Sequence, residues 1–277
     1  MNELHRDALS IDLDEDSRKL RRLVLDGIAG GGRGHIGPAL SVLEIIDVLY
    51  SHVMKHRPSE PNWENRDYFI LSKGHACLAQ YAVLAAHGYF DSQELSTFCK
   101  YDSRLGGHPE WHDLPGIEFS TGSLGHGLAV AVGLAMGAKL KQTSQRVYVV
   151  LGDGELGEGS IWESAMHASK HDLDNLCVII DYNNMQAFGA LDLVLPLRQI
   201  KEKWESFGFN VVEVNGHSRK ELDSACSQSD SRNGKPTAVI AYTVKGKGIS
   251  SAENSAIWHH KAKISQEDID ELKVSLE

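Results

Sequence analysis

The chain has 277 residues, a formal net charge of −10 and a hydrophobic fraction of 42%, which suit one large α/β domain or two small ones. The excess of acidic residues argues against nucleic acid as the main partner, and no apolar run approaches the roughly 20 residues that span a membrane. Four scattered cysteines without a C-x-x-C pair indicate reduced thiols, and the polar first ten residues lack a signal-peptide core, so a cytoplasmic location is expected.

The first half of the chain predicts helices joined by loops rich in glycine and histidine. Hydrophobic periodicity and turn residues predict helices over 14–29, 41–54, 76–87 and about 127–140, and a strand over 69–71. Residues 101–127 have the least regular pattern and are rich in Gly, Pro and His. Irregular segments of this length in compact domains are usually functional or disordered, and the aromatic residues here argue against disorder.

The centre of the chain predicts a strand, a glycine loop, a helix and a second strand, over residues 147–151, 152–159, 160–170 and 177–180. Such units form parallel sheets, and ligands bind beyond the carboxyl ends of parallel strands. Asp153 follows the first of these strands and Asn183 follows the second. We therefore expect the two side chains to lie at neighbouring strand ends.

The last third continues the alternation of strands and helices. It predicts helices over 197–207, over 218–226 and from 266 onward, and strands over 210–214 and 237–244. Repeated β–α units imply right-handed crossovers and one doubly wound, mainly parallel α/β sheet flanked by helices. No repeat or linker interrupts the pattern, so a single domain over 1–277 is expected.

Two interpretations compete for the glycine loop. It spells G-x-G-x-x-G between a strand and a helix, and Asp181 ends the next strand, where the ribose-binding acid of a nicotinamide site belongs. Alternatively, Asp153 and Asn183 are hard oxygen ligands for a Mg²⁺ ion that also binds a diphosphate. A carboxylate inside the loop would repel a bare pyrophosphate, whereas a bridging cation converts this repulsion into binding. Asp153 therefore favours the metal–diphosphate interpretation.

The spacing of these groups resembles the thiamine diphosphate motif. G-D-G at 152–154 is followed by Asn183, thirty positions after Asp153. In thiamine diphosphate enzymes the Asp, the Asn and a carbonyl two residues beyond the Asn hold the metal. The resemblance implies that Asp153, Asn183 and Met185 bind Mg²⁺, with Ca²⁺ or Mn²⁺ able to replace it, and that Gly152 and Gly154 contact the cofactor.

Four histidines each follow a glycine in a loop beside a helix or strand end: His35, His75, His108 and His126. One such histidine is more often structural than catalytic, but four in the same context favour a site that binds phosphate or moves protons. Zinc is an alternative, because His108 and His112 are four residues apart and His259 and His260 could add ligands. No Cys or acidic residue stands at a recognisable zinc spacing, which disfavours it.

Five segments also resemble transketolases and follow one another in the family's order. They are G-H-I-G, R-D-Y-F-I-L-S-K-G-H, G-H-P-E, G-S-L-G-H-G and W-H-H-K, at 34–37, 66–75, 107–110, 122–127 and 258–261. His260 stands where the family usually has Gly. Because these motifs span most of the chain, they are far more specific than the Asp–Asn pair, and the chain resembles the diphosphate-binding part of a transketolase.

The resemblance implies a role for each of these segments. Four histidines would line the reaction centre: His35, His75, His108 and His259. Of these, His75 and His259 would also contact the cofactor. The cofactor's aminopyrimidine would meet Gly122, Ser123 and Leu124. Glu158 resembles an acid at the subunit interface that couples the two sites, and Lys245 is expected to face the cofactor and the substrate channel.

Full-length transketolases are more than twice as long and include a pyrimidine-binding domain with the Glu that activates the cofactor. The resemblance therefore implies a split enzyme, inactive alone, whose C-terminal-type partner subunit completes a heterotetramer. This transferase would move a two-carbon ketol unit from a ketose (phosphate) donor to an aldose acceptor. Alternatives are transfer from a 2-oxo acid or another donor in a specialised pathway, an NAD-dependent oxidoreductase, and a non-catalytic scaffold subunit.

Overall fold

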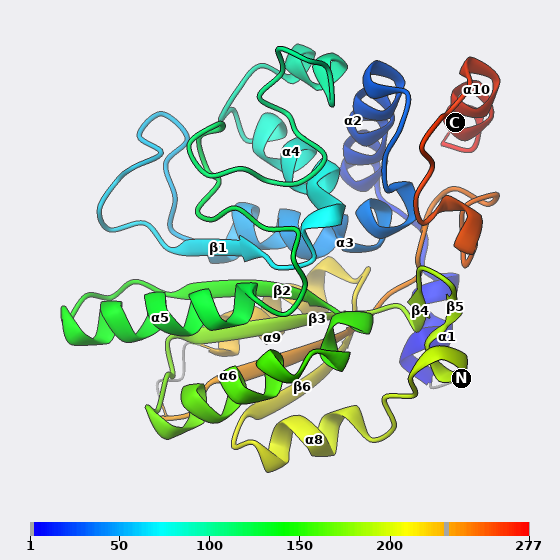
Figure 1. The fold of residues 1–277 in the computed structure, drawn as a ribbon. Coiled ribbons are helices and arrows are strands. Elements are labelled where there is room, and N and C mark those ends of the chain that lie inside the picture. Colours follow the sequence, from blue (N-terminus) through cyan, green and yellow to red (C-terminus); the bar gives the residue numbers. More distant parts are fainter. Residues whose placement is uncertain (1–2, 230–232, 277) are drawn as a thin grey trace.

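The computed structural model describes residues 3–229 and 233–276 and is built around a five-stranded sheet (Figure 1). The strand order is β1-β2-β3-β7-β6, and every pairing in it is parallel. In chain order the strands are β1 Tyr68–Leu71, β2 Val147–Gly152, β3 Leu176–Tyr182, β6 Asn210–Asn215 and β7 Thr237–Tyr242. The predicted parallel sheet flanked by helices is confirmed.

Ten α-helices are found in the described ranges: α1 Glu3–Ser10, α2 Glu15–Gly31, α3 Ile36–Val48, α4 Cys77–Ala86, α5 Gly127–Leu140, α6 Gly159–Lys170, α7 Leu191–Val194, α8 Ile200–Ser206, α9 Arg219–Gln228 and α10 Gln266–Val274. A short antiparallel hairpin, β4 Met185–Gln186 with β5 Gly189–Ala190, follows β3. No helix or strand interrupts residues 98–126, as the sequence predicts.

Alternation along the strands divides the core into two layers. Tyr148 and Val150 of β2 belong to one hydrophobic cluster, whereas Val147, Val149 and Leu151 belong to the other, because successive side chains of a strand point to opposite faces. The first cluster contains residues of α2, α3, α4 and α9, and the second contains residues of α5, α6 and α8 (Figure 1). Both faces of the sheet are therefore covered by helices.

Several element boundaries differ from the prediction. α3 begins at Ile36 rather than 41 and continues into a π-helical segment, Leu49–Val53. Pro38 lies in its first turn, where a missing N–H breaks no intrahelical hydrogen bond. α1 and α7 were not predicted, and α8 occupies only 200–206 of the predicted 197–207.

The α3 segment also has the composition of a membrane span. Ile36–Val53 is 18 residues long with a mean hydropathy of 1.3, but 83% of it is buried inside the fold. It packs against α4 and α2 in the first hydrophobic cluster. Its apolar character is thus explained by its place in the core.

The glycines after α2 turn the chain toward the strand ends. Gly32 adopts a left-handed conformation, φ 62°, and its N–H donates to the carbonyl of Ile28, as a helix-ending glycine does. Gly34 and Lys261 then exchange two backbone hydrogen bonds of 3.0 Å each. This bridge places the loop before α3 beside residues 258–261.

Candidate functional site

A cavity of about 350 Å³ lies beyond the carboxyl ends of β1, β2, β3 and β7. Most of the predicted site residues line it: His35, His75, His108, Gly122, Leu124, Gly152, Asp153, Gly154, Asn183, Met185, Lys245 and His259. Ser123 and Glu158 do not line it, and both are exposed at the surface. Their contacts with the aminopyrimidine and with a second chain stay predictions.

Asp153 is a buried carboxylate, only 2% exposed, in the turn after β2. Its Oδ1 accepts a hydrogen bond from the Gly154 N–H at 2.7 Å, and its Oδ2 accepts one from the Asn184 N–H at 2.6 Å. Burial and the nearby Asp181 raise the pKa of Asp153 to about 7. In the described part of the chain no cationic side chain forms an ion pair with it, so a bound cation would supply the missing counter-charge.

Asn183 and Met185 follow β3 on the same side of the cavity. The Asn183 side chain donates from Nδ2 to Asp181 Oδ2 at 3.0 Å and accepts from the Met185 N–H at Oδ1, 3.1 Å away. These two bonds fix the amide, with its oxygen on the Met185 side. Asp153, Asn183 and Met185 therefore line one cavity, and their binding of a metal ion stays a prediction.

Lys245 is 1% exposed and follows β7. Its Nζ donates to the carbonyls of Met185 and Gln186, at 3.2 and 3.3 Å, and lies 2.7 Å from His259 Nδ1. Because an ammonium group only donates, Nδ1 is the acceptor and the neutral His259 ring carries its proton on Nε2. Burial and the charge of Lys73 lower the pKa of Lys245 to about 8, which leaves an ammonium ion in the cavity at neutral pH.

The histidines gather around His35. Its ring centroid lies 4.5 Å from that of His260, 5.5 Å from His75, 5.8 Å from His259 and 6.2 Å from His108. Burial, reinforced by neighbouring positive groups, lowers the pKa of His35 to about 4 and that of His259 to about 3. Burial also lowers the pKa values of His75 and His108. All four predicted catalytic rings are therefore neutral at pH 7.

Two histidines singled out from the sequence lie elsewhere. His126 immediately precedes α5, is exposed and does not line the cavity. His112 stacks on Trp111 with a centroid distance of 3.8 Å and is also outside the cavity. Of the four histidines in the Gly-His pattern, three therefore share one site and His126 does not.

Asp181, the candidate ribose-binding acid of the dinucleotide interpretation, is fully buried. Its carboxylate forms an ion pair with Lys73 and accepts hydrogen bonds from Ser41 Oγ at 2.7 Å, Thr243 Oγ1 and Asn183 Nδ2. Although burial opposes ionisation, Lys73 keeps the pKa of Asp181 below its ordinary value. Protein groups thus occupy the oxygens that a ribose would need, which argues against the dinucleotide interpretation.

Comparison with known proteins identifies the family. Residues 14–277 match the family model described as "Transketolase, thiamine diphosphate binding domain". The chain belongs to the transketolase family. Among its relatives, one of the subunits of the apulose-4-phosphate transketolase of Phocaeicola vulgatus is 41% identical over 248 residues, 90% of this chain and 88% of that protein. The 6-deoxy-6-sulfo-D-fructose transketolase subunit SqwG of a Clostridium species is 39% identical over 257 residues, 93% of each.

Solved transketolases share the fold but are longer. The Campylobacter jejuni transketolase superimposes with a TM-score of 0.86 and 35% identity, covering 100% of this chain but only 43% of that one. The Leishmania mexicana transketolase gives a TM-score of 0.87 at 32% identity, with 41% of that chain covered. The chain thus spans about two fifths of these solved transketolases and nearly the full length of the relatives named as subunits.

The side chains that line the cavity suit a hard cation together with the diphosphate of the cofactor that the family model names. Over the described ranges, no group of three or more His, Cys, Asp or Glu residues that could hold a metal ion is found. A hard cation would instead use one carboxylate, Asp153, with amide, carbonyl and phosphate oxygens. Lys245 provides a positive charge, and the imidazole N–H groups provide donors, for an anionic ligand.

Sequence reasoning missed two buried charged residues of this transketolase site. Glu155 accepts hydrogen bonds from Ser72 Oγ at 2.5 Å, Gly125 N–H at 2.8 Å and Gly152 N–H at 3.1 Å, and so ties together three loops around the cavity. Lys73, 2% exposed, neutralises Asp181 beneath the cavity. A lysine directly after an apolar strand was the available signal, because lysine is seldom fully buried unless paired.

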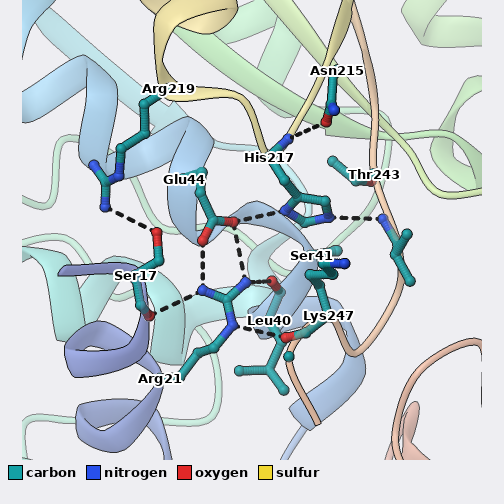
Figure 2. Close-up of polar contacts among 12 residues, drawn as sticks. Ser17, Arg21, Leu40, Ser41, Glu44, Asn215, His217, Arg219, Thr243 and Lys247 are labelled. Atoms are coloured by element: carbon teal, nitrogen blue, oxygen red, sulfur yellow. Dashed lines mark hydrogen bonds and ion pairs between the residues drawn. The ribbon is translucent and has the colours of Figure 1, made fainter. Parts of the chain in front are cut away.

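A buried polar cluster supports the Lys245 segment from behind (Figure 2). All five N–H groups of Arg21 donate: to the carbonyls of Ser17, Leu40 and Lys247 and to both oxygens of Glu44. His217 Nδ1 lies 2.8 Å from Glu44 Oε2, and its Nε2 accepts the N–H of Val244 at 2.9 Å. The cluster thereby fixes the residue immediately before Lys245.

Proposed function

We propose that the chain is the N-terminal, diphosphate-binding subunit of a two-chain transketolase that uses thiamine diphosphate and Mg²⁺. The observation that carries this is Asp153, a buried carboxylate that lines the same cavity as Lys245 and four neutral histidines and has no paired cation among the described residues. A cavity with an uncompensated acid and several donors suits a cation together with a polyanion. Membership of the transketolase family supports the same ligand pair.

Asp153, Asn183 and the Met185 carbonyl would hold the metal ion, for which Ca²⁺ or Mn²⁺ could substitute. Gly152 and Gly154 would let the diphosphate approach the backbone, because they have no side chain. When bound, thiamine diphosphate supplies the carbon nucleophile and the electron sink needed to break and form a bond beside a ketose carbonyl.

The four neutral imidazoles would handle the substrate's hydroxyl groups. A neutral ring can accept a proton at one nitrogen and donate at the other. In His259 the acceptor Nδ1 is engaged by Lys245, so its Nε2–H is the group that could donate to a substrate oxygen. A polyhydroxylated sugar needs several such contacts, which supports ketol transfer more than transfer from a 2-oxo acid.

The partner would be a C-terminal-type subunit that brings the pyrimidine-binding domain and its activating Glu. Two relatives of similar length are named as transketolase subunits, which supports a two-chain enzyme, here proposed as a heterotetramer. Their names also specify unusual anionic sugars, a sugar phosphate and a sulfosugar. We therefore infer that the donor is an anionic ketose and that the enzyme serves a specialised pathway.

Isothermal titration calorimetry with the partner subunit tests this assignment. Thiamine diphosphate should bind only with Mg²⁺, and Asp153→Asn should weaken binding at least 100-fold, because a metal ligand is lost. The exposed, matched variant Asp172→Asn should bind normally. Metal-independent binding, or equal binding by Asp153→Asn, would refute the assignment, whereas tight NAD binding to Asp153→Asn would restore the dinucleotide interpretation.

A further inference from the structure

Three pairs of histidines in the chain are four residues apart: His52 and His56, His108 and His112, and His167 and His171. On an α-helix this spacing places two side chains on the same face, one turn apart. Two imidazoles in that position can bind one metal ion together. Whether a pair can do so depends on its backbone and on the groups that its rings already contact.

The first two pairs do not have the required geometry. Both ring nitrogens of His56 have protein partners, the Tyr89 hydroxyl at 3.0 Å and the Tyr50 carbonyl at 2.6 Å. His108 lines the cavity, whereas His112 lies outside it. Both are in the segment 98–126, which has no α-helix, so a spacing of four does not place their rings on a shared face.

His167 and His171, in contrast, lie along a helix. His167 is part of α6, and the N–H of His171, the residue that ends the helix, donates to the His167 carbonyl at 3.1 Å. α6 is anchored in the core through Ile161, Ala165 and Ala168. The ring centroids are 6.2 Å apart, and the ring planes are nearly parallel, at 13°. The two rings therefore stand side by side on a firmly packed helix.

Both rings are exposed and available to a ligand. Neither forms a hydrogen bond or an ion pair with a residue in 3–229 or 233–276, and neither lines the cavity that contains Asp153. A tetrahedral ion with bonds of about 2.0–2.1 Å to nitrogen needs two nitrogens about 3.3 Å apart. Rotation of these exposed side chains about χ1 and χ2 can bring one nitrogen of each ring to that separation.

We propose that His167 and His171 together chelate a divalent transition-metal ion of the zinc, nickel and copper class. Neutral imidazole suits these ions, whereas the oxygen ligands of the Asp153 cavity suit Mg²⁺, Ca²⁺ and Mn²⁺. Two protein ligands leave the other coordination positions to water or to a group of another molecule. The site is separate from the proposed cofactor site and does not depend on ketol transfer.

Isothermal titration calorimetry of the full chain with Zn²⁺ tests the site. His167→Ala and His171→Ala should each weaken one binding event at least tenfold, because chelation gives the second imidazole a high effective concentration. The control His126→Ala removes an exposed histidine without another at helical spacing and should leave that event unchanged. All three rings are exposed, so the variants should unfold at the same urea concentration as the wild type.

Imidazole NMR signals show where the ion binds. Zn²⁺ should shift the signals of His167 and His171 together, whereas Mg²⁺ at the same concentration should shift neither. Cu²⁺ should bind this pair more tightly than Zn²⁺ does, as it does at nitrogen sites in general.

A loss of less than tenfold in either variant would overturn chelation, because the two rings would then not act together on one ion. NMR shifts confined to other histidines would overturn the site itself. The same titration of the chain assembled with its partner should again shift both signals, and the loss of both shifts would overturn the site for the assembled enzyme. None of these results depends on whether the chain binds thiamine diphosphate.

Discussion

Glu44 and Asp153 are both buried carboxylates, yet their pKa values shift in opposite directions. Burial disfavours the charge of each. At Glu44, Arg21 and His217 more than compensate, and the pKa falls well below its ordinary value. Asp153 receives two backbone N–H groups but no paired cation from residues 3–229 and 233–276, and its pKa rises to about 7.

This difference in pKa shift distinguishes a carboxylate that stabilises the fold, Glu44, from one that is available to a ligand, Asp153. Around Glu44 the protein supplies every partner, so the cluster is complete without any other molecule. Around Asp153 the protein supplies a carboxylate and, nearby, the ammonium group of Lys245, but these two groups do not form an ion pair with each other. The same kinds of residue therefore serve the scaffold in one place and form a candidate binding site in the other.

The largest expected effect is on stability, from Glu44→Gln. This change leaves the buried Arg21 without its counter-charge and should lower the free energy of unfolding by about 3–5 kcal/mol, measured by urea denaturation. The exposed pair Arg22–Glu15 offers the control, since Glu15→Gln should cause no measurable loss. If both variants are equally stable, the Glu44 cluster does not hold the scaffold.

His217→Ala should have a smaller effect, about 1–3 kcal/mol, because it leaves the Val244 N–H without its acceptor. Hydrogen exchange should speed up at Val244 in particular. As a comparison within the same protein, exchange at Val149 in the middle of β2 should follow only the global loss of stability. Unchanged protection at Val244 would contradict the hydrogen bond to His217.

Asp153→Asn makes the same chemical change as Glu44→Gln but should destabilise the ligand-free chain much less. It removes a buried charge without a cation paired to it in the described residues, which favours folding, but it leaves one of the N–H groups of Gly154 and Asn184 without an acceptor. The free energy of unfolding should therefore fall by no more than about 1–2 kcal/mol. Urea denaturation without metal or cofactor measures this. A loss of several kcal/mol would show that the two carboxylates do not differ in the way described.

The smallest effect is a pH dependence in the Glu44 contribution. A carboxylate with a lowered pKa stabilises the fold above its ordinary pKa, 4.5 for Glu44, and loses this contribution as the pH falls below that value. The stability difference between wild type and Glu44→Gln should therefore be constant from pH 8 to 6 and shrink below about pH 4.5. Denaturation curves at several pH values measure this. If the linkage is absent, the free energies of unfolding of wild type and Glu44→Gln will differ by the same amount at every pH.

The sequence predicted the sheet well, because apolar strands and glycine loops are local signals. It also placed Asp153 and Asn183 correctly at neighbouring strand ends, because parallel strands bring equivalent ends together. Selecting the histidines of the site required the family resemblance. The Gly-His pattern alone grouped His126 with the others, although His126 is exposed and lies outside the cavity.

Residues that act through distant partners could not be predicted. Arg21 lies on an amphipathic helix and Glu44 on an apolar, fully buried one, and the contact of Glu44 with His217 spans 173 positions. Glu155 looked like one more loop acid, since only the folded chain brings Ser72 and Gly125 to it. One pocket beside the cavity is likewise lined by residues of three separate segments, Arg33, Lys100 and His260.

The bridge between Gly34 and Lys261 has a consequence for synthesis on the ribosome. His35 is made early and His259 late, and their rings end 5.8 Å apart. The nascent polypeptide can form most of its sheet before residues 258–261 leave the exit tunnel, but it cannot close the histidine cluster. Any affinity for the coenzyme that depends on His259 therefore arises only after residues 258–261 have left the exit tunnel.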